Sequence, residues 1–162
     1  MYKKEFNTIV KDILDNENFI NLNQELHHGI TRYDHSLRVA KTTYKIGKKL
    51  RMKNLEDTTR AALLHDFYTD SQFKEEKPNE RLYLHPELAA KNAKEEYQIN
   101  ALQENIIKSH MFPLKGEKPK YKEAWLVSGV DKIVAAYEMY RFKASLMVNI
   151  WVLFLFNLLI QK

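Results

Sequence analysis

Glycine and proline are scarce in this chain, with 4 of each among 162 residues. An all-β sandwich or barrel needs a turn about every 8–12 residues, and glycine and proline supply many of those turns. Helices are therefore favoured. A chain of this length corresponds to about one domain, which can bury roughly 68–70% of its unfolded surface without disulfides or a partner. We expect a single domain built around one hydrophobic core.

Apolar residues recur at helical spacing along most of the chain, and no segment shows the alternation typical of a strand. Thr31 can cap a helix, and Asn100 can do so with Gln103 in a capping box. Loops are expected at Asn18–Ile30 and Thr69–Glu80. The fold class is therefore all-α, a single-domain helical bundle. The predicted helices cover residues from about 3 to 15, from 31 to 50, from about 54 to 66, from His85-Pro86 onward, from 100 to before Pro113, and from about 121 to 142.

The last part of the sequence differs from the rest. From Leu146 to Ile160 the only polar residues are Asn149 and Asn157. This segment is shorter than the ~20 apolar residues that span a bilayer. We therefore expect three parts: an N-terminal helix and loop (1–28), a central domain (29–143) and an additional hydrophobic C-terminal helix (144–162). That helix is either buried, in the core or in a homodimer interface, or associated with a membrane.

The composition excludes several chemistries. The chain contains 0 Cys, so disulfides, thiolate zinc sites, iron–sulfur clusters and a cysteine nucleophile are ruled out. Any metal must be bound by His, Asp or Glu. With 26 Lys and Arg against 21 Asp and Glu, the net charge is +5, which indicates a mixed surface with a mild preference for anions. The N-terminus has no apolar stretch typical of a secretory signal. We expect a cytoplasmic protein, with membrane association as the alternative.

Six polar side chains stand where a helical core would not choose them, because each ends or interrupts an apolar face. An ionised carboxylate at Asp131, inside the apolar stretch 125–134, costs several kcal/mol unless a positive group compensates it. A metal ion would do so, and so would a Lys or Arg. Imidazole and carboxylate ligands without sulfur suit first-row divalent ions. Each histidine could instead be a hydrogen-bonded core residue, and His85 could cap a helix. The six are His35, His65, Asp66, His85, His110 and Asp131.

In their order and context these residues resemble the HD-domain superfamily of metal-dependent phosphohydrolases. Arg32–Ala40 and Ala61–Asp66 are similar to the first two motifs of that family, and Val130–Ile133 is similar to its last. The resemblance implies an all-helical bundle with one or two divalent ions, which could be Fe, Mn, Ni, Zn or Mg. His85 and His110 are similar to the extra ligands of two-metal members such as the diadenosine tetraphosphate hydrolases of the YqeK type. The implied metal ligands are His35, His65, Asp66 and Asp131 for one site, with His85 and His110 completing the second.

The resemblance also implies a reaction. A phosphate ester or anhydride of a nucleotide-like small molecule would be hydrolysed by a metal-activated water, with Asp66 bridging the two ions. Arg32 and Lys132 would hold phosphoryl oxygens, so the implied catalytic residues are Asp66, Arg32 and Lys132. After Asp66 the sequence continues with Phe67–Asp70, without a Glu-Asp pair like that of guanosine tetraphosphate hydrolases, and the chain lacks the Gly-Tyr-Pro signature of cyclic dinucleotide phosphodiesterases. Those two substrates are therefore not expected.

Two other functions stay open. A few HD proteins use the same ordered ligand set to hold a mixed-valent di-iron pair that activates oxygen, so an oxygenase is the first alternative. The second is a non-enzymatic module that acts at a membrane surface or binds another partner. Arg38, Lys41, Lys45 and Lys48 share one helix edge, which is either solvated or faces anionic lipid. Nucleic acid is not the expected partner, because the nearby tyrosines lack the interleaving of a base-stacking platform.

Overall fold

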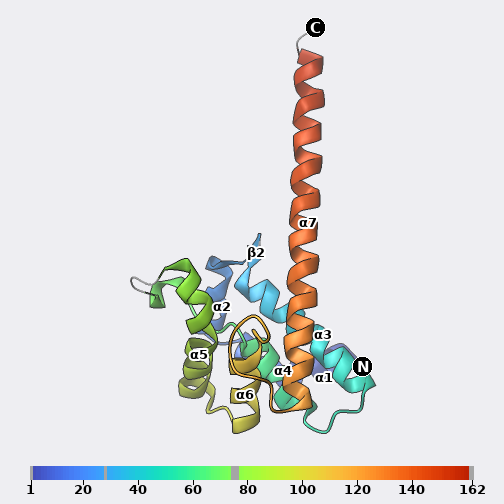
Figure 1. The fold of residues 1–162 in the computed structure, drawn as a ribbon. Helices are drawn as coiled ribbons and strands as arrows, with labels where there is room; N and C mark the ends of the chain where they lie inside the picture. Colours follow the sequence, from blue (N-terminus) through green and yellow to red (C-terminus); the bar gives the residue numbers. More distant parts are fainter. Residues whose placement is uncertain (1, 28, 74–76, 161–162) are drawn as a thin grey trace.

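The computed structural model describes residues 2–27, 29–73 and 77–160 (Figure 1). These residues form an all-α domain, as the sequence predicts, with one small hairpin of two-residue strands. His28 and residues 74–76, in the two predicted loops, lie outside the described residues. The elements are α1 (Tyr2–Leu14), α2 (Glu17–Ile20), the 3₁₀ helix η1 (Asn21–Gln24), β1 (Leu26–His27), β2 (Ile30–Thr31), α3 (Arg32–Lys49), α4 (Leu55–Leu64), the 3₁₀ helix η2 (Asp70–Gln72), α5 (Pro78–Tyr97), α6 (Ala101–Ser109) and α7 (Lys122–Ile160).

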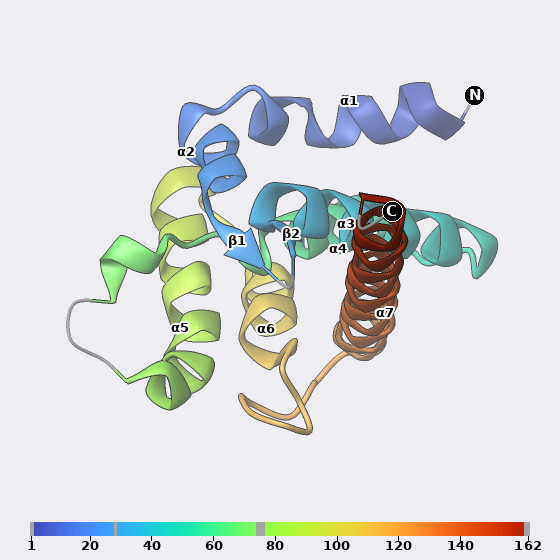
Figure 2. The same cartoon turned by 90° about the horizontal axis from the view of Figure 1, so that it is seen from above.

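Helix α4 is the centre of the bundle. It contacts α1, α3, α5, α6 and α7, and its last turn, Ala61–Leu64, is fully buried. A helical turn that is apolar on all sides, like this last turn, needs neighbours on all sides. Figure 2 shows how they are arranged: α5, α6 and α7 follow one another along one side of α3 and α4, and α1 lies on the other side.

Both predicted helix caps are present. The Thr31 side chain accepts a hydrogen bond from the backbone N–H of Asp34 at the start of α3. At the start of α6, Asn100 and Gln103 exchange side-chain to backbone hydrogen bonds of 2.9 Å each. These caps satisfy N–H groups that have no partner within the helix. They fix the first turn of α3, which carries His35, and the start of the helix that leads to His110.

The prediction that the fourth helix opens at His85-Pro86 is wrong. Helix α5 begins at Pro78, and Pro86 lies inside it. Proline is favoured in the first turn of a helix, so both prolines are plausible starts, and local sequence does not separate them. Packing of the small residues Ala89, Ala90 and Ala93 in the core supports a helix that continues through Pro86. His85 therefore projects from the middle of a helix, and its interpretation as a cap is also wrong.

Helix α7 joins two segments that the sequence analysis separated. The predicted helix from 121 to 142 and the apolar segment after it are one continuous helix (Figure 1). Its first part packs against α3 and α6, whereas the later part projects away from the bundle. Leu146, Met147, Val148 and Ile150 are all exposed. For these residues, burial in the core of the same chain is excluded. Among the described residues, no helix combines the length and the apolar character needed to cross a membrane.

Candidate metal centre

The structure brings the six predicted ligands together from five helices or helix ends. His35 lies in the first turn of α3, His65 and Asp66 directly follow α4, His110 follows α6, and the remaining two residues lie within α5 and α7. All six side chains are buried, with Asp131 the most exposed at 7%. Four imidazoles and two carboxylates in the interior need partners of opposite charge or matching hydrogen bonds.

Backbone carbonyls orient three of the four imidazoles. His65 Nδ1 donates to the carbonyl of Ala62 at 2.9 Å, and His110 Nδ1 donates to that of Ile107 at 2.7 Å. The last carbonyls of an α-helix have no partner within the helix, so a histidine directly after the helix can use one of them. His85 Nδ1 likewise donates to the carbonyl of Arg81 at 3.1 Å. In a neutral ring held this way, Nε2 keeps its lone pair and can bind a metal ion.

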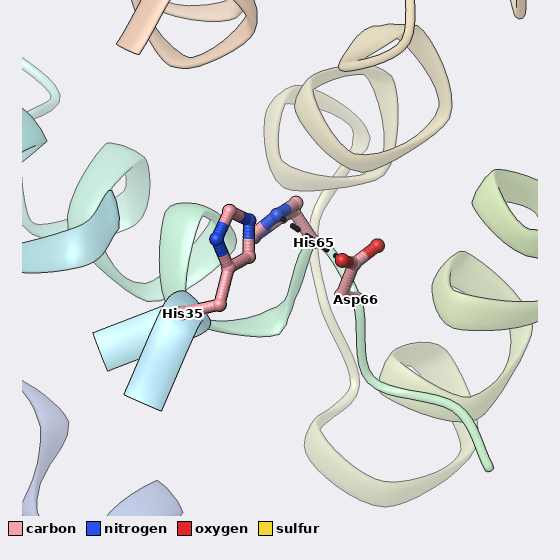
Figure 3. A group of neighbouring side chains, drawn as sticks. All are labelled: His35, His65 and Asp66. Carbon is pink, nitrogen blue, oxygen red and sulfur yellow. Dashed lines mark ion pairs between the residues drawn. The ribbon is translucent and has the colours of Figure 1, made fainter. Parts of the chain in front are cut away.

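The first group of ligand atoms comprises His35, His65 and Asp66 (Figure 3), each with one atom within 4.8 Å of the others. Asp131 closes this group from α7. Its Oδ1 lies 3.1 Å from His35 Nε2 and 3.5 Å from His65 Nε2. The same Nε2 atom of His65 lies 3.6 Å from Asp66 Oδ2. Two imidazole nitrogens thus face two carboxylates.

The second group comprises Asp66, His85 and His110. The Nε2 atoms of both histidines lie 3.6 Å from Asp66 Oδ1 and 3.1 Å from each other. Asp66 therefore belongs to both groups, with Oδ2 turned to the first and Oδ1 to the second. A carboxylate shared in this way can bind two ions at once, one through each oxygen.

Burial keeps both imidazoles of the second group neutral. It lowers the pKa of His85, and it lowers that of His110 to about 3, with the nearby imidazole of His65 adding to the effect. Both rings are therefore neutral at pH 7, with the proton on Nδ1 and a lone pair on Nε2, and their two Nε2 atoms face each other. Two nitrogens that bind one ion at about 2.1 Å lie roughly 3.0–3.4 Å apart, which agrees with the separation of 3.1 Å. This pair fits a cation better than it fits a hydrogen bond.

The first group favours positive charge. Burial disfavours the imidazolium, but Asp131 and Glu138 raise the pKa of His35 to about 10. Asp66 and Asp131 likewise raise the pKa of His65 against the effect of burial. Despite its own burial, the Asp131 carboxyl has a pKa held well below its usual range by the two imidazoles. The buried Nε2 of His65 makes no hydrogen bond among the described residues. A divalent ion would supply the positive charge these carboxylates favour, and nitrogen and oxygen ligands suit it.

Arg32 lies close to the centre but donates to protein groups. Its guanidinium is buried and donates to the carbonyl of Tyr68 at 3.0 Å, to Asp70 at 3.0 Å and to Glu25 at 3.3 Å. It also lies 4.0 Å from the centroid of the Tyr68 ring. Arg32 thus holds the segment that follows Asp66, and its contact with a phosphoryl group stays a prediction.

Lys132 is half-buried and supports His110. Its ammonium donates to the carbonyl of His110 at 2.7 Å, and to the carbonyl and hydroxyl of Ser128 at 3.2 and 3.0 Å. A cation at the carbonyl end of a helix also stabilises that end. The structure therefore gives Lys132 a positioning contact, and its contact with substrate stays a prediction.

Glu138 is a buried residue that the sequence analysis missed. Its side chain is 1% exposed and accepts two hydrogen bonds of 2.7 Å, one from His35 Nδ1 and one from Arg38. Glu138 lies seven residues after Asp131, so both residues share one face of α7. That spacing from a predicted ligand is the sequence signal that could have identified it. The contact orients the ring of His35 from behind.

The basic edge of α3 is partly used within the chain. Arg38 pairs with Glu138, and Lys48 pairs with Glu5 and Tyr44. Lys41 and Lys45 are exposed. Two of the four basic residues on this edge thus pair with acidic residues of the same chain. Less positive charge is left on the edge to attract an anionic partner.

Comparison with known proteins matches the central part of the chain. Residues 32–136 match the family model described as the HD domain. This range contains all six predicted ligands, together with Arg32 and Lys132, and it ends two residues before Glu138. No curated protein and no solved structure matches the chain.

Proposed function

Because the chain belongs to the HD-domain family, whose members are mostly metal-dependent phosphohydrolases, we propose that it hydrolyses a phosphate ester or anhydride of a nucleotide-like small molecule. The observation that carries this proposal is the shared carboxylate of Asp66. It stands between two groups of inward-facing imidazole Nε2 atoms. Paired sites a few ångström apart are the arrangement that two-metal phosphoryl chemistry uses.

In this proposal His35, His65, Asp66 and Asp131 hold one ion. Asp66, His85 and His110 hold the second, as in the two-metal members of the family. The ions would supply positive charge for the phosphoryl oxygens in the transition state and a water whose pKa is lowered toward 7. The identity of the metal is left to measurement, since imidazole and carboxylate ligands accept several divalent ions.

The chain's own residues would prepare the site. The carbonyls of Ala62 and Ile107 hold two imidazoles with Nε2 inward, so the ligands need little rearrangement. Asp131 and His85 are the most exposed of the six side chains, at only 7% and 5%. The burial of the others excludes bulk water, which strengthens electrostatic interactions inside the site.

The test begins with the metal content of the purified protein, measured by elemental analysis. Nucleotides, dinucleoside polyphosphates and sugar phosphates are then assayed for phosphate release without oxygen, in the presence of Mn²⁺. We expect metal-dependent release from at least one class. Release without oxygen would eliminate the oxygenase alternative, whereas turnover that requires oxygen and ferrous iron would contradict the proposal.

Variants connect the activity to the site. Asp66→Asn removes the charge of the shared carboxylate, so metal content should fall below the wild-type stoichiometry and activity should fall by about 100-fold while helicity is retained. Lys45→Ala, at an exposed position of α3, is the control and should keep wild-type metal content and activity. Wild-type metal stoichiometry in Asp66→Asn would overturn the assignment.

A further inference from the structure

The part of α7 that projects from the bundle carries its apolar side chains in the open. Glu138 is buried, but Tyr140 and Phe142 are already exposed. Further along the helix, Leu146, Met147, Val148 and Ile150 are between 50% and 61% exposed. Figure 1 shows this part of the helix extending well beyond every other element. Contiguous exposed apolar surface of this kind marks an interaction site.

The apolar surface surrounds the helix instead of forming one stripe. Successive residues of an α-helix point about 100° apart, so the exposed residues 146–148 point in three different directions. In the sequence, the positions seven residues after Ser145 and Asn149 are the apolar Val152 and Phe156. The sequence therefore does not continue this short polar stretch along the apolar segment. A helix that is apolar on all sides belongs in a protein core or in a membrane.

A second copy of the chain is a poorer match to this surface than lipid. Two paired helices bury a seam made of about two positions in every seven, and the other positions face water. Pairing along residues 146–148 would cover one of three apolar directions and leave the rest exposed. The hydrocarbon of a lipid layer covers all sides of a helix at the same time.

The charge distribution points to the same partner. Arg141 and Lys143 lie just before the apolar stretch, and the sequence contains no Asp or Glu after Glu138. Basic residues at the edge of an apolar segment interact with anionic headgroups. The β1–β2 hairpin lies at the end of the bundle from which α7 projects (Figure 1), and Leu26 of this hairpin is 77% exposed. This end therefore combines apolar and basic groups.

From these observations we infer that α7, from about residue 144 onward, inserts into an anionic lipid bilayer and anchors the domain to its surface. Residues 144–160 extend over about 26 Å at 1.5 Å per residue, which is less than the ~30 Å of the hydrocarbon layer. The anchor requires insertion from one side and does not require the helix to cross. It is independent of the metal centre, since none of the residues that carry it is a proposed ligand.

Vesicle flotation with the full chain tests the anchor. One set of vesicles contains phosphatidylcholine alone and the other contains about 30% phosphatidylglycerol. Most of the wild-type protein should float with the anionic vesicles. The double variant Leu146→Glu/Val148→Glu should reduce the floating fraction at least 10-fold. Leu114→Glu is the matched control, because Leu114 is 66% exposed but lies outside α7, and it should float like the wild type.

A fluorescence measurement tests insertion directly. The chain has two tryptophans, Trp125 and Trp151, so Trp125→Phe leaves Trp151 as the reporter in α7. Lipids brominated on their acyl chains should quench its emission, and acrylamide in water should quench it less once vesicles are added. Quenching by acrylamide that vesicles do not change would overturn the proposal, and so would flotation of the double variant at the wild-type level. Self-association through α7 without flotation would overturn it in favour of a second copy.

Discussion

Glu138→Gln should weaken metal binding although Glu138 would not touch the metal. The carboxylate accepts hydrogen bonds of 2.7 Å from His35 Nδ1 and from Arg38. The amide of glutamine keeps the shape of the side chain but offers one acceptor oxygen in place of two. Its NH₂ group would face a donor, so one of the two bonds is lost, together with the negative charge behind the ring of His35.

The size of the effect follows from these contacts. A hydrogen bond to a charged group contributes about 1.5–3 kcal/mol, and loss of a carboxylate behind a metal-bound histidine typically costs 10–100-fold in affinity. We therefore expect metal affinity to fall 10–100-fold. Stability should fall by only about 1–2 kcal/mol, because the Arg38 side chain is 43% exposed and water can replace its lost partner.

Competition with a chromogenic chelator measures the affinity, and urea unfolding measures the stability. The matched control is Glu123→Gln: Glu123 is also buried on α7, but its carboxylate accepts from Asn54 at 3.2 Å, outside the metal centre. The control should bind metal like the wild type. If a folded Glu138→Gln protein bound metal as tightly as the control, the orienting role of Glu138 would be refuted.

Four further predictions concern single substitutions and the removal of metal. Lys132→Met removes the donor to the carbonyl of His110, so elemental analysis after dialysis should show the second ion lost first, whereas equal loss of both ions would contradict this. Chelation should lower the thermal midpoint by about 5–10 °C, since saturation at 100 times Kd contributes about 2.7 kcal/mol, and added Mn²⁺ should restore it in a thermal-shift assay. Gly116→Ala places a Cβ 2.7 Å from the carbonyl oxygen of Lys108 at a φ of +79° and should cost about 1–3 kcal/mol. Gly129→Ala, with open space around its Cβ inside α7, should instead gain about 0.8–1.0 kcal/mol. Urea midpoints that both fall would contradict the Gly129 assignment, and midpoints that both rise would contradict the Gly116 assignment.

The residues of the centre could be predicted because each one breaks an apolar pattern. Asp131 lies among the buried residues Val127, Val130 and Val134, and His65 and Asp66 follow four buried apolar residues. A polar group at such a position needs compensation, so the sequence itself singles it out. The structure places these groups within a few ångström of one another, although the chain positions of His35 and Asp131 differ by 96 residues.

What local patterns could not show is which faces meet. Glu138 follows Tyr137 and precedes Met139 and Tyr140, all exposed, so its neighbours give no sign of burial. Only the packing of α7 against α3 places it behind His35. The start of α5 was missed for a related reason. Local sequence favours a helix start at Pro86, but α5 contains this proline, and the small residues after it pack in the core.

One helix connects the two proposals made for this chain. Asp131 and the apolar stretch from residue 144 lie on α7, with no Gly or Pro between them, so the helix acts as a stiff spacer. Thirteen residues at 1.5 Å place Asp131 about 20 Å from the hydrocarbon layer when α7 stands upright. The headgroup region is only about 5–8 Å thick on each side, so the metal centre would lie in water beyond it. An anchored enzyme of this shape should act on water-soluble phosphates and should leave the phosphates of intact bilayer lipids uncleaved, as assays of free nucleotides and of lipid phosphates in the same vesicles would show. Cleavage of bilayer lipid phosphates at a comparable rate would mean that α7 bends or lies along the surface.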